Sequence, residues 1–119
     1  TIDNATNIMT VDGTLRVTAD VIAYYSSDKR LKDNVTLIDN ALEKVEKLGG
    51  YEFDWNENQN IHEGHDIGVI AQEIESQFPE LVTTREDGYK AVKYEKLTAV
   101  LIQAIKELKI EVDNLKNRK

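Results

Sequence analysis

Cysteine is absent from this 119-residue chain, and histidine and proline are scarce, with two copies and one copy respectively. The lack of cysteine excludes disulfides, iron–sulfur clusters and cysteine-based zinc sites. Long apolar runs are missing too, since a run such as Ala99–Ile102 is far shorter than the ~20 residues of a membrane-spanning helix. We therefore expect no cysteine chemistry and no membrane partner.

Positive charge is in deficit, with 15 Lys and Arg against 22 Asp and Glu and a net charge of −7. An acidic domain repels phosphate backbones, so this composition argues against nucleic acid as a partner. The length suits a single domain, and 40% apolar residues is ordinary for a soluble protein. The chain opens with Thr-Ile-Asp and its one methionine is internal, at Met9, so we expect a piece of a longer polypeptide.

The first 26 residues favour β structure, because Thr, Asn, Asp and Val dominate them. Asp12-Gly13 is a turn signal, and the apolar residues within 15–25 predict two short strands. A stretch of this size cannot bury a core of its own. We therefore expect it to depend on the rest of the chain, on an upstream part or on further copies of itself.

A helix is predicted for about residues 37–48, where apolar side chains recur at helical spacing. Thr36 and Asp39 have the spacing of a capping box, which would start the helix. Gly49-Gly50 would end it with a left-handed stop.

Short elements of both kinds are predicted for the middle of the chain. Aromatic residues alternate with acidic ones in 51–55, which predicts a strand with an aromatic face, and the polar stretch 56–66 predicts a loop. The remaining elements, in chain order, are a short buried strand at 67–70, a helix at 71–78 that stops before Pro79, and a hairpin of 81–84 and 89–92 around Glu86-Asp87-Gly88.

The last helix, predicted for about residues 94–117, carries a heptad pattern. Leucine fills the d positions and β-branched residues fill a, as in Leu101, Ile105, Leu108, Val112 and Leu115. Extra apolar residues at its start predict packing on the globular part, which leaves the C-terminal half with a bare seam. Because such a helix is marginal in water, the pattern predicts oligomerisation; a helix packed within one monomer is the alternative. Taken alone, β-branched a and leucine d residues lean towards two strands.

Several patterns that could carry chemistry are weak. His62 and His65 have a metal-ligand spacing, but no cysteine or further histidine joins them, so we expect a solvated loop and no metal site. Glu73 and Glu75 are expected to be solvated on a helix rather than paired for acid–base work. The aromatic strand 51–55 could bind a sugar but is more typical of core.

The segment 26–32 places serine close to lysine. A serine hydroxyl is a weak nucleophile unless a base activates it. A lysine amine is such a base only when burial or neighbouring cations lower its pKa, and Lys29 and Arg30 are such cations. On spacing alone, a charged connector is the more ordinary interpretation.

The run Ser27-Asp28-Lys29-Arg30-Leu31-Lys32, followed by Asn34-Val35, resembles the S-D-x-R-L-K-x-N-[IV] signature of a self-cleaving family. This family comprises the C-terminal intramolecular chaperone domains of phage endosialidases, tail spikes and tail fibres. The resemblance covers about residues 27–119. Its further pieces, in the family's order, are Ala41–Leu48, Phe53-x-Trp55, Gly68–Ile74, Phe78–Val82 and Val92–Leu108.

The resemblance implies a domain that trimerises at the end of a fibre polypeptide, aligns three chains so that upstream β structure can fold, and then cuts itself off. It implies Ser27 as the nucleophile, Lys32 as the dyad lysine and the Ser26–Ser27 peptide bond as the scissile bond. Asp28 and Arg30 are candidate supporting residues, with salt-bridge roles an equal alternative. No cofactor is implied, and the partners would be identical chains and the upstream fibre segment.

The sequence and the resemblance together predict an α+β fold in two parts. Residues 1–26 would be the end of a β-structured fibre. Residues 27–119 would be the trimerisation chaperone and autoprotease, a small mixed globular part with a long C-terminal helix in a trimeric bundle or coiled coil.

Where the protein works is also predicted, and two alternatives stay open. We expect assembly in the host bacterial cytoplasm, after which the fibre enters the virion tail and the cleaved domain is released. One alternative is a permanent, non-cleaving trimeric fibre tip that binds a host receptor. The other is the similar self-cleaving domain of eukaryotic membrane-bound transcription factors.

Overall fold

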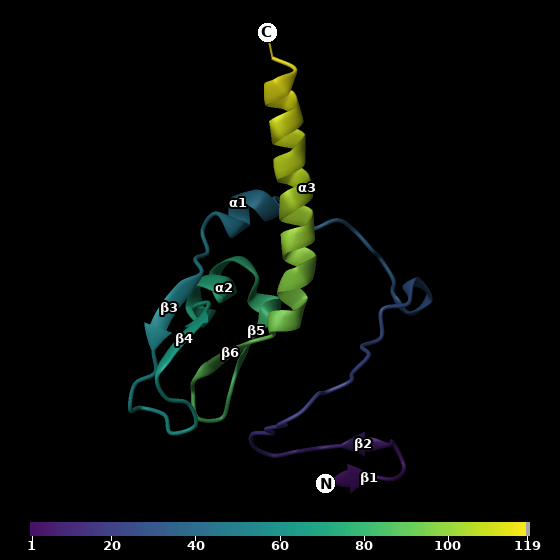
Figure 1. Cartoon of the computed structure of the whole chain (residues 1–119). Helices are drawn as coiled ribbons and strands as arrows, with labels where there is room; N and C mark the ends of the chain where they lie inside the picture. Colours follow the sequence, from purple (N-terminus) through teal and green to yellow (C-terminus); the bar gives the residue numbers. More distant parts are fainter. Residues whose placement is uncertain (119) are drawn as a thin grey trace. The chain divides into compact units, whose positions relative to one another are not determined.

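The computed structural model describes residues 1–118, which form two units, one from Thr1 to Val35 and one from Thr36 onward. Nearly all of the regular secondary structure belongs to the second unit (Figure 1). Across residues 1–118, no helix combines the length and the apolar character that crossing a bilayer requires.

The first unit opens with one small antiparallel pair, β1 (Ile2–Asp3) and β2 (Ile8–Met9). The Asp3 carboxylate accepts the backbone N–H groups of Ala5 and Thr6, which fixes the turn between the two strands. Two residues in each strand is too short a pairing to be stable alone, so the unit has little to hold it together.

The two strands predicted within residues 15–25 are wrong, because this stretch contains neither strand nor helix. An extended segment becomes a strand only when a neighbour completes its hydrogen bonds, and β1 and β2 pair only with each other. The apolar side chains of the stretch are consequently exposed, as Ile22 and Tyr24 illustrate. The first unit therefore buries no core of its own.

The second unit is an α+β fold of short antiparallel strand pairs and helices, as predicted. Its elements are α1 (Ala41–Val45), β3 (Tyr51–Asp54), β4 (His65–Gly68), α2 (Ala71–Gln77), η2 (Pro79–Leu81), β5 (Val82–Thr84), β6 (Lys90–Val92), η3 (Tyr94–Lys96) and α3 (Leu97–Lys116), where η marks a 3-10 turn. β3 pairs with β4 and β5 with β6. The long C-terminal helix predicted from the heptads is α3, which runs past the other elements of its unit (Figure 1).

The core of the second unit lies where α2, η2 and α3 meet. Its buried side chains are Ile74, Phe78, Leu81 and Val100. Apolar residues of α1, β5 and β6 pack around them. α2 stops before Pro79, as predicted, but it ends at Gln77, one residue earlier than expected, because Pro79 disfavours helical backbone in the residue before it. The core thus joins the start of α3 to the middle of the chain.

α1 is shorter than the helix predicted for 37–48, because neither of the predicted end signals operates. The helix does not start after Thr36; instead Asn40 precedes it with a left-handed backbone, φ 51°. The predicted left-handed stop is also wrong, since neither Gly49 nor Gly50 has a positive φ.

The start of α1 is capped by a residue of α3. The Glu107 carboxylate accepts the backbone N–H groups of Ala41 at 3.2 Å and Leu42 at 3.1 Å. Gln103, one turn earlier on α3, donates its side-chain N–H to the same carboxylate at 3.3 Å. A negative charge here satisfies free N–H groups and favours the positive end of the helix. One side chain therefore fastens α1 to α3.

Gly49 is needed for a close approach rather than for a left-handed turn. A Cβ atom at this position would lie 2.5 Å from the ring of Tyr51. That ring is held there because the Tyr51 hydroxyl donates to Glu73 at 2.6 Å, and the same carboxylate accepts the N–H of Gly49 at 3.1 Å. The hydrogen bond to Glu73 also raises the pKa of Tyr51. β3 is thereby tied to α2.

The two strand pairs form in about the predicted parts of the chain, but one strand predicted to be buried is exposed. The strand predicted at 67–70 forms two residues earlier, as β4 at His65–Gly68, and it is not buried, since Ile67 is 72% exposed. Its neighbour is β3, whereas the core forms against α2 and η2. The β5–β6 hairpin is confirmed, with Gly88 at φ 88° donating its N–H to the carbonyl of Arg85.

Replacing Ile74 with alanine tests the core. We expect the free energy of unfolding to fall by about 2–5 kcal/mol, the usual loss when a buried aliphatic side chain leaves a cavity. The matched control is Ile67→Ala on the exposed face of β4, which we expect to stay within about 0.5 kcal/mol of the parent protein. Chemical denaturation of the two variants measures the difference, and equal losses would contradict this location of the core.

The Glu107 cap gives the protein a testable acid sensitivity. The N–H groups of Leu42 and then Ala41 that bond the carboxylate hold the pKa of Glu107 below its usual value. A group whose pKa is lowered by folding stabilises the fold above the usual pKa, about 4.3, and this contribution disappears as the pH falls through the folded-state value.

We therefore expect Glu107→Gln to melt at a lower temperature than the parent protein near pH 7, because its amide NH2 would face one of the two backbone N–H groups. The difference should vanish in acid. Circular dichroism melts across pH measure it, with Glu86→Gln at the hairpin tip as the control that shows no such trend. A pH-independent gap between Glu107→Gln and the parent protein would refute the charged cap.

Candidate functional site

The serine and the lysine singled out in the sequence are in contact in the first unit. The Nζ atom of Lys32 lies 2.8 Å from the Oγ atom of Ser27 and donates a hydrogen bond to it. A protonated amine donates in this pair, and a neutral amine at the same distance can accept the hydroxyl proton. The geometry is that of a nucleophile beside a base.

A tight turn produces this contact. Five residue steps of extended chain span about 17 Å, so an extended segment would hold the two side chains far apart. The chain instead forms the 3-10 turn η1 (Lys29–Leu31), in which Leu31 N–H donates to the carbonyl of Asp28 and Lys32 N–H to that of Lys29. The turn folds Lys32 back towards the residue that precedes it.

Asp28 and Arg30, the candidate supporting residues, bond to each other. The Asp28 carboxylate accepts the backbone N–H of Arg30 at 2.9 Å, and both of its oxygens accept from the guanidinium, at 3.1 and 2.9 Å. The side-chain bond to Arg30, followed by the backbone bond, lowers the pKa of Asp28, and the pKa of Arg30 is raised in turn. Asp28 is therefore the N-cap of η1 and the ion-pair partner of Arg30.

The whole segment from 26 to 32 is exposed in the single chain. The Arg30 side chain is 88% exposed and that of Asp28 46% exposed. Water around a lysine favours its charged form, and burial favours the neutral form that can act as a base. The single chain thus has the contact between Ser27 and Lys32, but not the burial of Lys32 that would let its amine act as a base.

The structure does not bring the two histidines together as ligands. His62 stacks on Trp55 with ring centroids 4.6 Å apart, whereas His65 lies between Glu52, at 3.1 Å, and Asp54, at 3.0 Å. These carboxylates, Glu52 foremost, raise the pKa of His65. Within residues 1–118, no group of three or more His, Cys, Asp or Glu side chains is arranged to hold a metal ion.

The two helical carboxylates have structural partners. Glu73 binds Gly49 and Tyr51 as described above, and Glu75 forms an ion pair with Lys90 at 3.0 Å. None of these bonds joins Glu73 to Glu75. The sequence predicts solvated carboxylates at both positions, and no local pattern indicates that each one bonds α2 to another element.

The heptad side chains of α3 form a seam that the single chain leaves uncovered. They are Leu101, Ile105, Leu108, Val112 and Leu115, and each is between 37% and 65% exposed. The inward face of the helix is a separate stripe, in which Val100 and Ala104 are buried and Glu107 caps α1. α3 therefore packs on its own unit along one stripe and presents another, apolar one outward.

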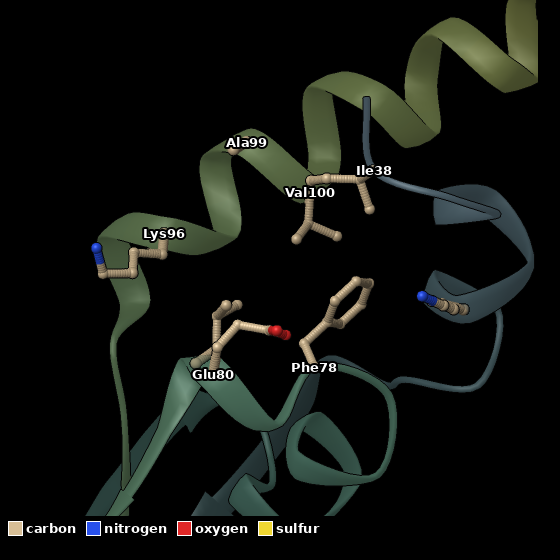
Figure 2. A pocket seen from close by; sticks show the side chains of 8 residues that line it. Ile38, Phe78, Glu80, Lys96, Ala99 and Val100 are labelled. Carbon is tan, nitrogen blue, oxygen red and sulfur yellow. The ribbon is translucent and has the colours of Figure 1, made fainter. Parts of the chain in front are cut away.

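Sequence reasoning missed a pocket of about 440 Å³ in the second unit. Figure 2 shows Phe78 and Val100 in its wall, with Glu80 and Lys96 at the side. Its other lining residues are Ile38, Lys44, Leu81 and Ala99, and the Lys44 ammonium lies 5.4 Å from the centre of the Phe78 ring. These residues come from distant parts of the chain, so no local sequence pattern marks the pocket. Its lining contains no serine, threonine or cysteine.

The family model described as chaperone of endosialidase, a peptidase family by name, matches residues 27–83. The match begins at Ser27, the serine that Lys32 contacts. This part of the chain belongs to the endosialidase chaperone family. The resemblance stated from the sequence is confirmed.

Curated relatives are long tail fiber proteins named Gp37. That of Enterobacteria phage T2 is 37% identical over 102 residues, which cover 80% of this chain and 8% of the relative. That of Enterobacteria phage M1 is 37% identical over 101 residues, 78% of this chain and 39% of the relative. That of Salmonella phage S16 is 33% identical over 100 residues, 78% of this chain and 13% of the relative. The chain spans less than half the length of each of these relatives.

Proposed function

We propose that this chain is the C-terminal intramolecular chaperone of a phage tail fibre, which trimerises, registers the fibre and then releases itself by cutting between Ser26 and Ser27. The observation that carries the proposal is the 2.8 Å contact between Lys32 Nζ and Ser27 Oγ, at the start of the segment that belongs to the endosialidase chaperone family. The tail fiber relatives support the fibre as the upstream partner. Residues 1–26 would remain with the fibre and 27–119 would leave.

The chemistry is an acyl shift followed by hydrolysis. Neutral Lys32 takes the hydroxyl proton of Ser27, and Oγ attacks the carbonyl carbon of Ser26. The C–N bond breaks, the Lys32 ammonium returns the proton to the amine of Ser27, and an ester joins the two residues. Water then cleaves the ester, which yields the Ser26 carboxyl group and restores the Ser27 hydroxyl. Each chain reacts once, and neither a metal nor a cofactor takes part.

Trimerisation through the α3 seam is the second part of the proposal. Exposed apolar side chains at a and d positions favour burial against identical helices. The exposed apolar residues before Ser26 fit the same picture, because β structure that lacks a neighbour in one chain can find one in another. Assembly would also remove water from the dyad, so that cutting follows folding. We place this assembly in the host bacterial cytoplasm, before the fibre joins the virion.

Self-cleavage is tested by intact-mass analysis of the expressed chain. We expect two species, residues 1–26 and 27–119, in the parent protein and only the uncut chain in Ser27→Ala and Lys32→Ala, because each substitution removes one partner of the reaction. Ser26→Ala is the control, since it keeps the nucleophile and the base, and it should cut. An uncut parent trimer under native conditions would favour the permanent fibre tip instead.

Co-expression of Ser27→Ala chains with Lys32→Ala chains extends this test to the origin of the lysine. The structure joins Ser27 and Lys32 of one chain, so we expect no cleavage in mixed trimers. Cleavage of the Lys32→Ala chains would mean that a neighbouring chain supplies the base.

Assembly is tested by Leu108→Asp, which buries a charge in the proposed seam. We expect monomers in analytical ultracentrifugation and at least about tenfold less cleavage, because a buried unpaired charge is strongly unfavourable. The matched control is Ile110→Asp, whose side chain is also exposed on α3, at 59%, but lies off the a and d positions. It should trimerise and cut. Cleavage by monomeric Leu108→Asp would contradict chemistry that depends on assembly.

A further inference from the structure

The turn between Ser27 and Lys32 needs an interaction that stabilises it. A single 3-10 turn fixes several backbone angles for few hydrogen bonds, and these bonds have poor geometry. η1 has two backbone bonds, one to the carbonyl of Asp28 and one to that of Lys29. Without further support, such a turn opens readily and the side chains of Ser27 and Lys32 separate.

We propose that Asp28 is a positioning residue of the self-cleavage, holding η1 in the turn that brings Lys32 to Ser27; the inference rests on the proposed function. Its Oδ1 atom accepts the backbone N–H of Arg30 at 2.9 Å, so the Asp28 side chain caps the start of the turn. The carboxylate adds a third hydrogen bond to the two that the backbone makes.

The geometry distinguishes this role from that of a third proton-transfer group. Both Asp28 oxygens bond to Arg30, and no hydrogen bond described for residues 1–118 joins them to Lys32 or Ser27. Asp28 therefore acts on the dyad through the backbone of η1. The carboxylate carries no proton between Ser27 and Lys32 in this arrangement.

The two bonds of Asp28 contribute unequally. The ion pair to the Arg30 guanidinium lies at the surface, with Arg30 88% exposed, and exposed pairs of this kind contribute little. An N-cap bond to a backbone N–H satisfies a group that has no other partner in the turn, and its loss has the larger effect. The cap is thus the part of Asp28 that matters, and asparagine or serine can make the same cap.

The test measures the rate of cleavage when protein unfolded in urea is diluted into native buffer and timed samples are analysed by intact mass. We expect Asp28→Ala to cut about fivefold more slowly than the parent protein, the effect of losing one cap on the population of the turn. Asp28→Asn and Arg30→Gln should both stay within about twofold, since the cap bond remains in each. Asp33→Ala, which removes an acid just outside η1, is the matched control and should not change the rate.

The pH profile separates positioning from direct participation. A lost cap lowers the rate of Asp28→Ala by the same factor at each pH and leaves the midpoint of the profile unchanged. A shifted midpoint, an Asp28→Asn variant as slow as Asp28→Ala, or an Asp28→Ala variant as fast as the parent protein would each overturn the proposal. So would loss of the trimer in Asp28→Ala by analytical ultracentrifugation, because Asp28 would then act in assembly.

Failure of the proposed function is a different result. It appears as a parent protein that stays uncut, or as cleavage that persists in Ser27→Ala, and both are seen before any Asp28 variant is compared. A parent protein that cuts at Ser27 together with an Asp28→Ala rate equal to its own removes the positioning role and leaves the proposed function intact.

Discussion

The contact of α3 with its own unit is the constraint on which the rest of the second unit depends. Val100, Ala104 and Glu107 follow one another at helical spacing, so they lie on one stripe of the helix. Val100 enters the core, Ala104 is buried and Glu107 caps α1. Because a helix is rigid, fixing this stripe also fixes the direction of every other one. The seam of a and d residues, which lies beside this stripe, is thereby left exposed, as the proposed trimer requires.

The fold could be predicted from the sequence where the signals were local. α2 ends before Pro79 and the β5–β6 hairpin turns at Gly88, since each residue acts on its own backbone. The cap of α1 could not be predicted, because Glu107 lies 66 residues after Ala41 and a glutamate in a helix has many ordinary explanations. The burial of β4 was misjudged for a related reason: an apolar residue such as Ile67 does not reveal whether another element covers it.

The candidate site was predictable in its residues and not in its geometry. Spacing alone gave Ser27 and Lys32 little weight, and the family signature singled them out. Neither source reveals how two exposed residues five positions apart come to lie with Ser27 Oγ and Lys32 Nζ only 2.8 Å from each other. That geometry depends on η1 and on the cap in which Asp28 accepts the backbone N–H of Arg30. The sequence alone suggested several roles for Asp28 and did not distinguish this one.

The proposed chemistry has two requirements, contact between Ser27 and Lys32 and removal of water from Lys32, and the single chain meets only the first. The single chain already joins Ser27 Oγ to Lys32 Nζ, so the reacting groups need no search. Both residues are exposed, however, so water surrounds the lysine amine. Neighbouring chains packed around the segment would remove that water and favour the neutral amine. A site that is arranged in one chain and desolvated only in three would cut after assembly and stay silent before it, which is the order that a fibre chaperone needs.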